Sequence, residues 1–408
     1  MTRRTRVVAI ALTFVSAFAA ADVVTRVDDE RVAGKVTRVD SSGAVVVETG
    51  GRAATTVTIP AAEVLSVRFE TTPREPKGDL VASASGERFR VTVTSPAGTP
   101  VGTLVCEGAG ALRGKNAIPF ADLRAWIPLA DDGDSSRRSP LTEPDRSLAE
   151  ALALENDRDV ALMTSGDHLT GVVESLGPDE ARVTARLGAT AVTRAMLRGI
   201  AFSKTLKPWR EPVRLLAEVR LVDGSVILGD VSGPRDGAYT LRSALGMEWT
   251  AAADQVLEIR FRGGKLLWLS DLTPVKAETT PFFNRAWPWR KDLSVWGNPL
   301  TASGAAHERG IGTHSRTELT FDLAAQFTTF LADVAIDDET KGAGSATVSV
   351  TGDGRALLAP TEVAGGAKPR RVKLDVAGVR QLTLLVDYGK DEDAGDNVDW
   401  LDARLIRK

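Results

Sequence analysis

The feature that most constrains the fold is an internal repeat in the first 263 residues. Four segments end in similar runs rich in apolar residues, which are Val64–Phe69, Leu123–Ile127, Leu197–Phe202 and Val256–Phe261. In three of them an earlier strand carries a glycine, at Gly34, Gly171 and Gly229, which precedes the closing phenylalanine by 35, 31 and 32 residues. The second segment has no glycine at that place. Self-similarity at this spacing predicts several copies of one small supersecondary unit.

The repeat predicts four units, at residues 22–70, 78–129, 158–205 and 213–263. Short β-branched segments lie between the ends of the units, so we expect four or five short strands in each. A glycine inside a strand marks a sharp bend of the sheet, and the pattern resembles the small SH3-like and Sm-like barrels. Units of this size bury little surface alone, so we expect them to pack against one another. Residues 130–157 interrupt the series and are predicted to form an exposed linker with a short helix.

The first 21 residues have the composition of a secretory signal, with three arginines followed by the apolar run Val7–Ala20 and small residues for cleavage. The run is shorter than the roughly 20 residues that a membrane-spanning helix needs. We therefore expect an exported protein, periplasmic or extracellular, with no membrane span in the mature chain. The net charge of -3 gives no support to nucleic-acid binding. The single cysteine, Cys106, leaves no internal disulfide to form.

After Gly264 the repeat pattern ends, and several sequence motifs follow in a fixed order. They include Trp296–Leu300 (WGNPL), His307–Ser315 (HERGIGTHS) and Gly395–Ala403 (GDNVDWLDA). Together they resemble the NPCBM family of carbohydrate-binding modules over nearly the whole of residues 266–406. The resemblance implies that residues 265–408 fold as a galactose-binding-like jelly roll, a two-sheet β-sandwich that binds carbohydrate. The expected fold class is thus all-β, with tandem small barrels followed by a jelly-roll sandwich.

A sandwich carries its ligand sites on end loops, where the scaffold holds side chains rigidly. From the family motifs and the acidic turn after Ile336, we predict carbohydrate contacts from His314, Asp338, Asp396, Asn397 and Trp400. Two of these have an alternative role, because His314 could be a buried, hydrogen-bonded anchor and Trp400 could pack in the core. Trp287 and Trp289 flank a proline in a loop, which favours exposure and contact with a ligand.

Two acidic clusters lie on predicted loops of the same domain. Clustered carboxylates can assemble the 6–8 oxygens of a calcium site, and jelly-roll sugar binders often carry a structural calcium. We predict metal ligation by Asp337, Glu339, Asp393 and Asp399. The alternative is that both clusters are solvated acidic loops.

No catalytic motif accompanies these features. The sequence contains neither an H-E-x-x-H nor a G-x-S-x-G pattern, so no enzyme activity is predicted. The favoured function is glycan binding by the sandwich, with a glycan or glycosylated surface as partner. The alternative is a structural or assembly protein of the cell envelope that contacts other envelope proteins through the repeats. A hydrolase is the least supported interpretation.

Overall fold

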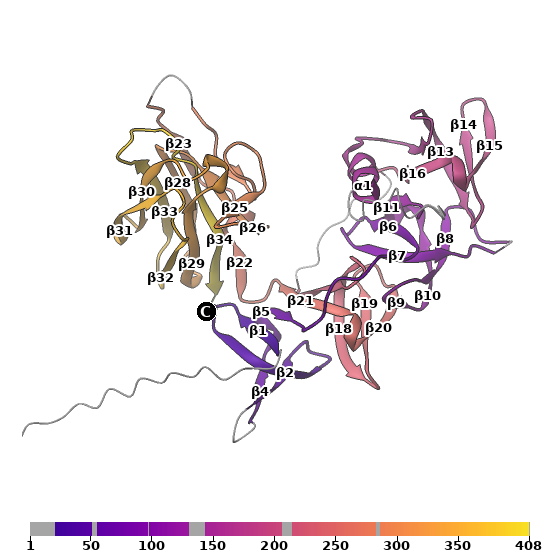
Figure 1. Ribbon diagram of the computed structural model, residues 1–408, viewed down its shortest axis with the longest axis horizontal. Helices are drawn as coiled ribbons and strands as arrows, with labels where there is room; N and C mark the ends of the chain where they lie inside the picture. Colours follow the sequence, from indigo (N-terminus) through magenta and orange to yellow (C-terminus); the bar gives the residue numbers. More distant parts are fainter. Residues whose placement is uncertain are drawn as a thin grey trace, which may run out of the picture.

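The computed structural model describes residues 21–50, 55–96, 98–129, 143–205, 214–282 and 286–407. In these residues the fold is almost entirely β, which confirms the predicted class (Figure 1). The signal segment, apart from its last residue, and the first part of the 130–157 linker lie outside the described residues. Among the described residues, no helix has the length and apolar character needed to cross a membrane.

Each repeat unit is a small antiparallel sheet with a 3-10 turn before its last strand. Unit 1 comprises β1 (Asp22–Arg26), β2 (Arg31–Val39), β3 (Val45–Thr49), β4 (Thr55–Ile59), η1 (Ala61–Glu63) and β5 (Val64–Arg68). Unit 2 comprises β6 (Asp79–Ser83), β7 (Arg88–Val93), β8 (Thr103–Gly108), β9 (Leu112–Arg113), β10 (Lys115–Pro119), η2 (Phe120–Asp122) and β11 (Leu123–Ile127). Unit 3 comprises β12 (Asp159–Met163), β13 (His168–Leu176), β14 (Glu180–Ala185), β15 (Gly188–Thr193), η4 (Arg194–Met196) and β16 (Leu197–Ala201). Unit 4 comprises β17 (Leu216–Leu221), β18 (Val226–Arg235), β19 (Ala238–Ser243), β20 (Glu248–Ala252), η5 (Ala253–Gln255) and β21 (Val256–Arg262).

Within a unit the first strand pairs with both the second and the last strand, as β1 does with β2 and β5. The glycine of the second strand permits the close approach of the third strand. A Cβ at Gly34, Gly171 or Gly229 would collide with a carbonyl oxygen of the third strand. In unit 2 the same position is Val91, and the glycine is found instead directly opposite, at Gly108 of β8. The likeness to SH3-like or Sm-like barrels stays a prediction.

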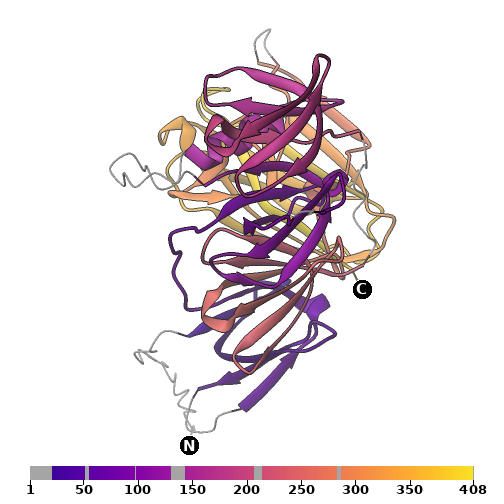
Figure 2. The same cartoon turned by 90° about the vertical axis from the view of Figure 1, so that its right-hand side faces the viewer.

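The four units form a row in the order 1, 4, 2, 3, which differs from their order in the chain (Figure 2). The last strands of units 1 and 4 pair with each other, and so do those of units 2 and 3. In the middle of the row, β20 of unit 4 pairs with β9 of unit 2. One continuous cluster of buried apolar side chains contains residues from all four units. The four segments therefore pack against one another over a shared apolar core.

The helix predicted within the linker is present as α1 (Glu143–Ala153), but it is not an exposed connector. Leu148 and Ala151 are 2% exposed and pack on apolar residues of units 2 and 3. The helix therefore covers the junction of these two units, because its apolar face needs a surface to bury against.

The remaining residues form a sandwich of two antiparallel sheets. Its first sheet has the order β24-β27-β34-β29-β32, with β22 also paired to β34, and its second has the order β23-β28-β33-β30-β31. A short hairpin, β25–β26, lies apart from both sheets. The elements are β22 (Leu266–Trp268), η6 (Leu269–Asp271), β23 (Lys276–Thr279), β24 (Arg290–Lys291), β25 (Leu300–Ala302), β26 (Ala305–His307), β27 (Gly310–Thr313), β28 (Thr317–Asp322), β29 (Phe327–Ile336), η7 (Asp338–Thr340), β30 (Ser345–Gly352), β31 (Arg355–Ala364), β32 (Arg370–Asp375), β33 (Gln381–Tyr388) and β34 (Val398–Arg407).

The sandwich packs directly on units 1 and 4. The guanidinium of Arg404, which is 2% exposed, donates to the carbonyl of Val27 at 3.2 Å and pairs with Asp29 in unit 1. Glu308 accepts from Arg220 at 2.8 Å and from Arg260 at 2.6 Å in unit 4. Charged contacts to both units, together with an apolar cluster that joins Val27 of unit 1 to Leu331 and Ile406, therefore hold the sandwich on the repeats.

Candidate functional site

One end of the sandwich brings four loops together, and Glu339 in η7 connects three of them. Its carboxylate accepts hydrogen bonds from Ser294 (2.8 Å) and Asn298 (2.9 Å), both in the loop between β24 and β25. It also accepts from the side-chain amide of Asn397, just before β34, at 2.9 Å. The two acidic or polar loops that the sequence analysis singled out, around Asp337–Glu339 and Gly395–Asn397, therefore meet here.

The same β24–β25 loop forms one wall of a cavity of about 350 Å³. The lining residues are Ala286, Trp287, Pro288, Arg290, Val295 and Trp296. Trp296 is 47% exposed, so its ring can be reached from solvent. Arg290 is held beside it, because its Nε donates to the carbonyl of Val295 at 2.9 Å. Two indole rings and a guanidinium thus border one hollow, next to the hydrogen-bonded group around Glu339.

His314 packs against Trp287, one of the residues that line this cavity. Its imidazole is 4% exposed and shares a hydrogen bond with the carbonyl of Ser315 at 2.9 Å. The ring centroid lies 5.9 Å from that of Trp287 at an interplanar angle of 32°. The burial and the hydrogen bond of His314 favour the anchor role of the two considered for it, in which the imidazole packs beside Trp287.

The other predicted contacts differ in what they do. Asp338 accepts backbone hydrogen bonds from Ser303 (3.0 Å) and Gly304 (2.7 Å), so its carboxylate holds the turn of the β25–β26 hairpin. Asp396 is fully buried, and burial raises the pKa of its carboxyl to about 6. Neither residue faces the cavity lined by the tryptophans. Of the predicted contact residues, Asn397 is the one tied directly to the Glu339 group.

Trp400 is a core residue. Its side chain is 0% exposed and lies in the apolar cluster between the two sheets, where its ring centroid is 6.5 Å from that of Phe330. The prediction that Trp400 contacts sugar is therefore wrong. In β34 the side chains alternate between the two faces of the sheet, and this one points inward.

The four predicted metal ligands do not form one site. Among the described residues, no group of three or more His, Cys, Asp or Glu side chains is arranged to hold a metal ion. Asp393 belongs to the β33–β34 loop beside Asp396. Asp337 already accepts from the backbone nitrogen of Thr301 (3.0 Å) and that of Glu339 (2.7 Å). Neither oxygen of Asp399 accepts a hydrogen bond, and burial, together with the nearby Asp337, raises its pKa well above the usual range.

We keep a structural calcium ion as a proposal for the Asp337–Asp399 pair, supported by the buried carboxylate of Asp399 that lacks a donor. Excess EDTA is then expected to lower the melting temperature, because a ligand of the native state contributes about 2.7 kcal/mol at a hundredfold excess over its Kd. Asp399→Asn should abolish the response, whereas Asp393→Asn in the other loop should leave it intact. Melting curves that do not change with chelator would contradict the proposal and favour a protonated Asp399.

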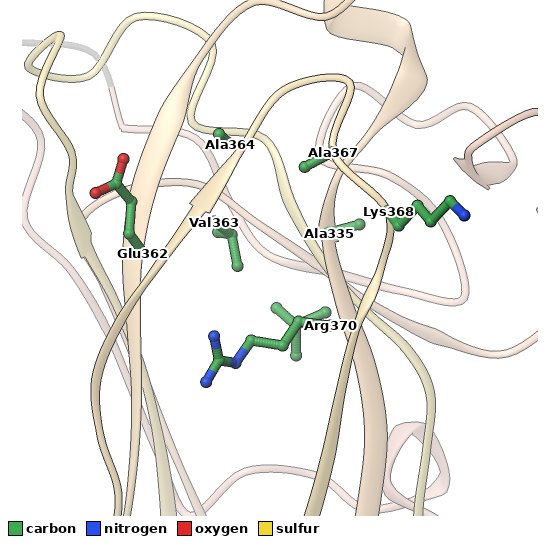
Figure 3. A pocket seen from close by; sticks show the side chains of 8 residues that line it. Ala335, Glu362, Val363, Ala364, Ala367, Lys368 and Arg370 are labelled. Atoms are coloured by element: carbon green, nitrogen blue, oxygen red, sulfur yellow. The ribbon is translucent and has the colours of Figure 1, made fainter. Parts of the chain in front are cut away.

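A second cavity, of about 410 Å³, opens at the edge of the sandwich between β31 and β32 (Figure 3). It has no aromatic side chain in its lining. Figure 3 shows the side chains of Lys368 and Arg370 extending away from each other, and Glu362 is paired with Lys390 at 2.7 Å. Because its polar groups do not converge, this cavity is a weaker candidate for a sugar site than the one lined by tryptophans.

The sequence pattern did not identify most of the residues that line the cavity. It placed Trp287 in an exposed loop, yet it did not assign a role to Arg290, Ser294, Trp296 or Asn298. The signal that could have identified them was the run Trp296-Gly297-Asn298, in which an aromatic side chain is followed by two turn-forming residues.

Comparison with known proteins gives the family of the sandwich. Residues 265–406 match the NPCBM/NEW2 domain. A curated relative named "Putative endo-alpha-N-acetylgalactosaminidase", from Renibacterium salmoninarum, is 28% identical over 110 residues, which are 27% of this chain and 7% of the relative. The chain therefore spans only a small part of the length of that relative.

Solved structures that are similar to this chain include carbohydrate-binding modules. A CBM51 module of a GH95 protein from Clostridium perfringens, in complex with methyl-galactose, is 26% identical, with 34% of this chain and 99% of that chain covered and a TM-score of 0.31. A CBM51 module in complex with GlcNAc, with adjoining domains from the same organism, is 21% identical, with 44% of each chain covered and a TM-score of 0.32. The tandem CBM51 modules of a family 98 glycoside hydrolase from Streptococcus pneumoniae are 13% identical, with 68% and 95% covered and a TM-score of 0.31.

Proposed function

Because residues 265–406 are an NPCBM/NEW2 carbohydrate-binding domain, we propose that the protein binds glycans in the cavity lined by Trp287 and Trp296. The observation that supports this most is the placement of an exposed indole, a guanidinium and hydrogen-bonding amides at one loop end. Sugar-binding sites combine an apolar surface with a few convergent polar groups.

The chemistry of the site suits a neutral sugar ring. The exposed face of Trp296 can cover the C–H groups of a pyranose, as an aromatic body with a polar edge does in many interfaces. Asn298 is exposed and can both donate and accept hydrogen bonds. Arg290 carries fixed N–H donors at the cavity wall. A single shallow site of this kind should bind weakly, with a Kd of about millimolar to micromolar, or about -4 to -8 kcal/mol.

We also propose that the protein is exported and acts without catalysis, with the repeats as a rigid platform for the sandwich. The amino-terminal segment supports export, and the absence of known catalytic motifs supports a binding role. The second candidate is a structural protein of the cell envelope. It is favoured by the size of the repeat region and by the extensive contacts between repeats and sandwich.

Isothermal titration of the protein with galactose-type and other glycans tests the proposal. Saturable binding of at least one glycan, competed by its free monosaccharide, is expected. If no glycan of a broad panel binds to folded protein at millimolar concentration, the envelope-structure alternative becomes the better explanation.

A further inference from the structure

The junctions between repeat units alternate along the row. Units 1 and 4 join through their last strands, β5 and β21, with Val67 opposite Ile259. Units 4 and 2 join through their fourth strands, because β20 pairs with β9. Units 2 and 3 again join through last strands, with Trp126 of β11 opposite Ile200 of β16. Single bridges between second strands, β18–β2 and β18–β7, accompany the first two junctions. By their main strand pairs, the junctions are therefore last-to-last, fourth-to-fourth and last-to-last.

The fourth-to-fourth junction shows how the outer edge of a fourth strand is paired by a neighbouring unit. In unit 2 the fourth strand is divided by Gly114 into β9 and β10, and it lies along β20. Thr250 and Ala251 of β20 pair with Arg113 and Leu112. The side chain of Asn116 donates to the carbonyl of Glu248 at 3.0 Å and accepts from its backbone nitrogen at 3.1 Å. At Glu248 and Thr250, the outward backbone groups of β20 are thus satisfied by the neighbouring unit.

The fourth strands of the two end units have no such neighbour. Among the described residues, β4 of unit 1 pairs only with β3, and β15 of unit 3 pairs only with β14. In β15 the first four residues are exposed. In Figure 1 the β14–β15 hairpin lies at the outer limit of the repeats. Both ends of the row therefore present an open strand edge.

The ladder register shows which backbone N–H groups of the edge strands point away from the neighbouring strand. The backbone N–H of Arg194 donates to the carbonyl of Asp179, in the register that continues the β14–β15 pairing. Bonded and non-bonded pairs alternate in an antiparallel ladder, so the N–H of Ala191 points away from β14. Ala191 lies three residues before the turn η4, and Thr250 lies three residues before the turn η5, so the two residues occupy the same place in their units. Thr250 pairs with unit 2 across the central junction. In unit 1, Thr58 of β4 likewise lies three residues before the turn η1, so it occupies the same place as Ala191.

Neither edge carries the usual protection against pairing. Natural proteins blunt open edges with charged side chains, proline or bulges. β4 (TTVTI) and β15 (GATAVT) contain no charged residue and no proline. Unit 3 also exposes the side chain of Leu187 fully at the turn of the β14–β15 hairpin. Unprotected edges of this length are suited to strand addition by a partner.

We propose that β15 of one copy of this chain pairs, antiparallel, with β4 of a second copy. A second copy fits because both strands are the fourth strands of their units, and the next junction of the alternating series is fourth-to-fourth. The contact is heterologous, so it leaves a free β4 and a free β15 at the two ends and can be repeated. The resulting row would present its sandwiches at regular intervals, and several weak sites on one surface gain avidity.

Sedimentation velocity over a range of protein concentrations tests the proposal. The wild-type protein is expected to reach at least twice the mass of one chain as concentration rises. Ala191→Pro should keep the protein at the mass of one chain, because proline removes the outward N–H without removing a bond to β14. Ala191→Val keeps that N–H and should associate like the wild type. Circular dichroism verifies that all variants are folded.

A complementation experiment tests which strands pair. Thr58→Pro should also give a monomer, since it removes the edge of β4. An equimolar mixture of the two proline variants should form 1:1 dimers, because each supplies the edge that the other has lost. A wild type that stays monomeric, association that persists in Ala191→Pro, or a mixture that forms no dimer would each overturn the proposal. None of these results depends on sugar binding.

Discussion

Replacing Trp296 by alanine is expected to weaken glycan binding by about 2 kcal/mol, or roughly thirtyfold in Kd. The reason is that Trp296 is the exposed ring of the cavity, and a stacked aromatic anchor contributes much of the affinity of a small site. Isothermal titration with the best glycan for the wild type measures the effect. Because the ring is 47% exposed, its removal should leave the melting temperature almost unchanged.

Leu293→Ala is the matched control for Trp296→Ala. Leu293 lies in the same loop and is 37% exposed, but it does not line the cavity. The Leu293→Ala variant should bind glycan like the wild type. Arg290→Ala is expected to reduce affinity as well, because it removes the fixed donors at the wall. If Trp296→Ala is folded and binds as well as the wild type, the sugar does not occupy this cavity.

Replacing Trp400 by alanine is expected to destabilise the sandwich by about 3–5 kcal/mol, the range for removing a large aromatic side chain from a packed core. Trp400 is 0% exposed and packs between the two sheets near Phe330. Chemical denaturation measures the loss as a lower midpoint. Any loss of glycan binding should disappear under conditions in which the variant is still folded.

The comparison of Trp400→Ala with Trp296→Ala separates the two roles of tryptophan in this domain. Trp400→Ala should lower stability and leave the glycan affinity of the folded fraction intact. Trp296→Ala should lower glycan affinity and leave stability almost unchanged. An unchanged denaturation midpoint for Trp400→Ala would contradict the buried placement of its ring.

Local patterns predicted the elements of this protein well. The closing runs from Val64 and Val256 are strands β5 and β21, as expected from their apolar content. The glycines at 34, 171 and 229 lie where the sheet bends, because a side chain there would collide with the facing strand. The motifs from Trp296 to Ala403 identified the sandwich, which the family match confirms. These features depend on residues close in the sequence, so the sequence determines them.

What depends on distant residues could not be predicted. The missing glycine of unit 2 is replaced by Gly108 on the facing strand, which only the register of β7 and β8 places opposite Val91. Trp400 and Trp296 are the same residue type in two family motifs, yet one is in the core and the other is on the surface.

The order of the units, 1, 4, 2, 3, likewise results from which strand edges match across the molecule. The sequence by itself determined the strands, the bends and the family of the sandwich. The tertiary structure alone decided which loops meet around Glu339, which edges are covered and which stay open, because those outcomes depend on packing between segments far apart in the chain.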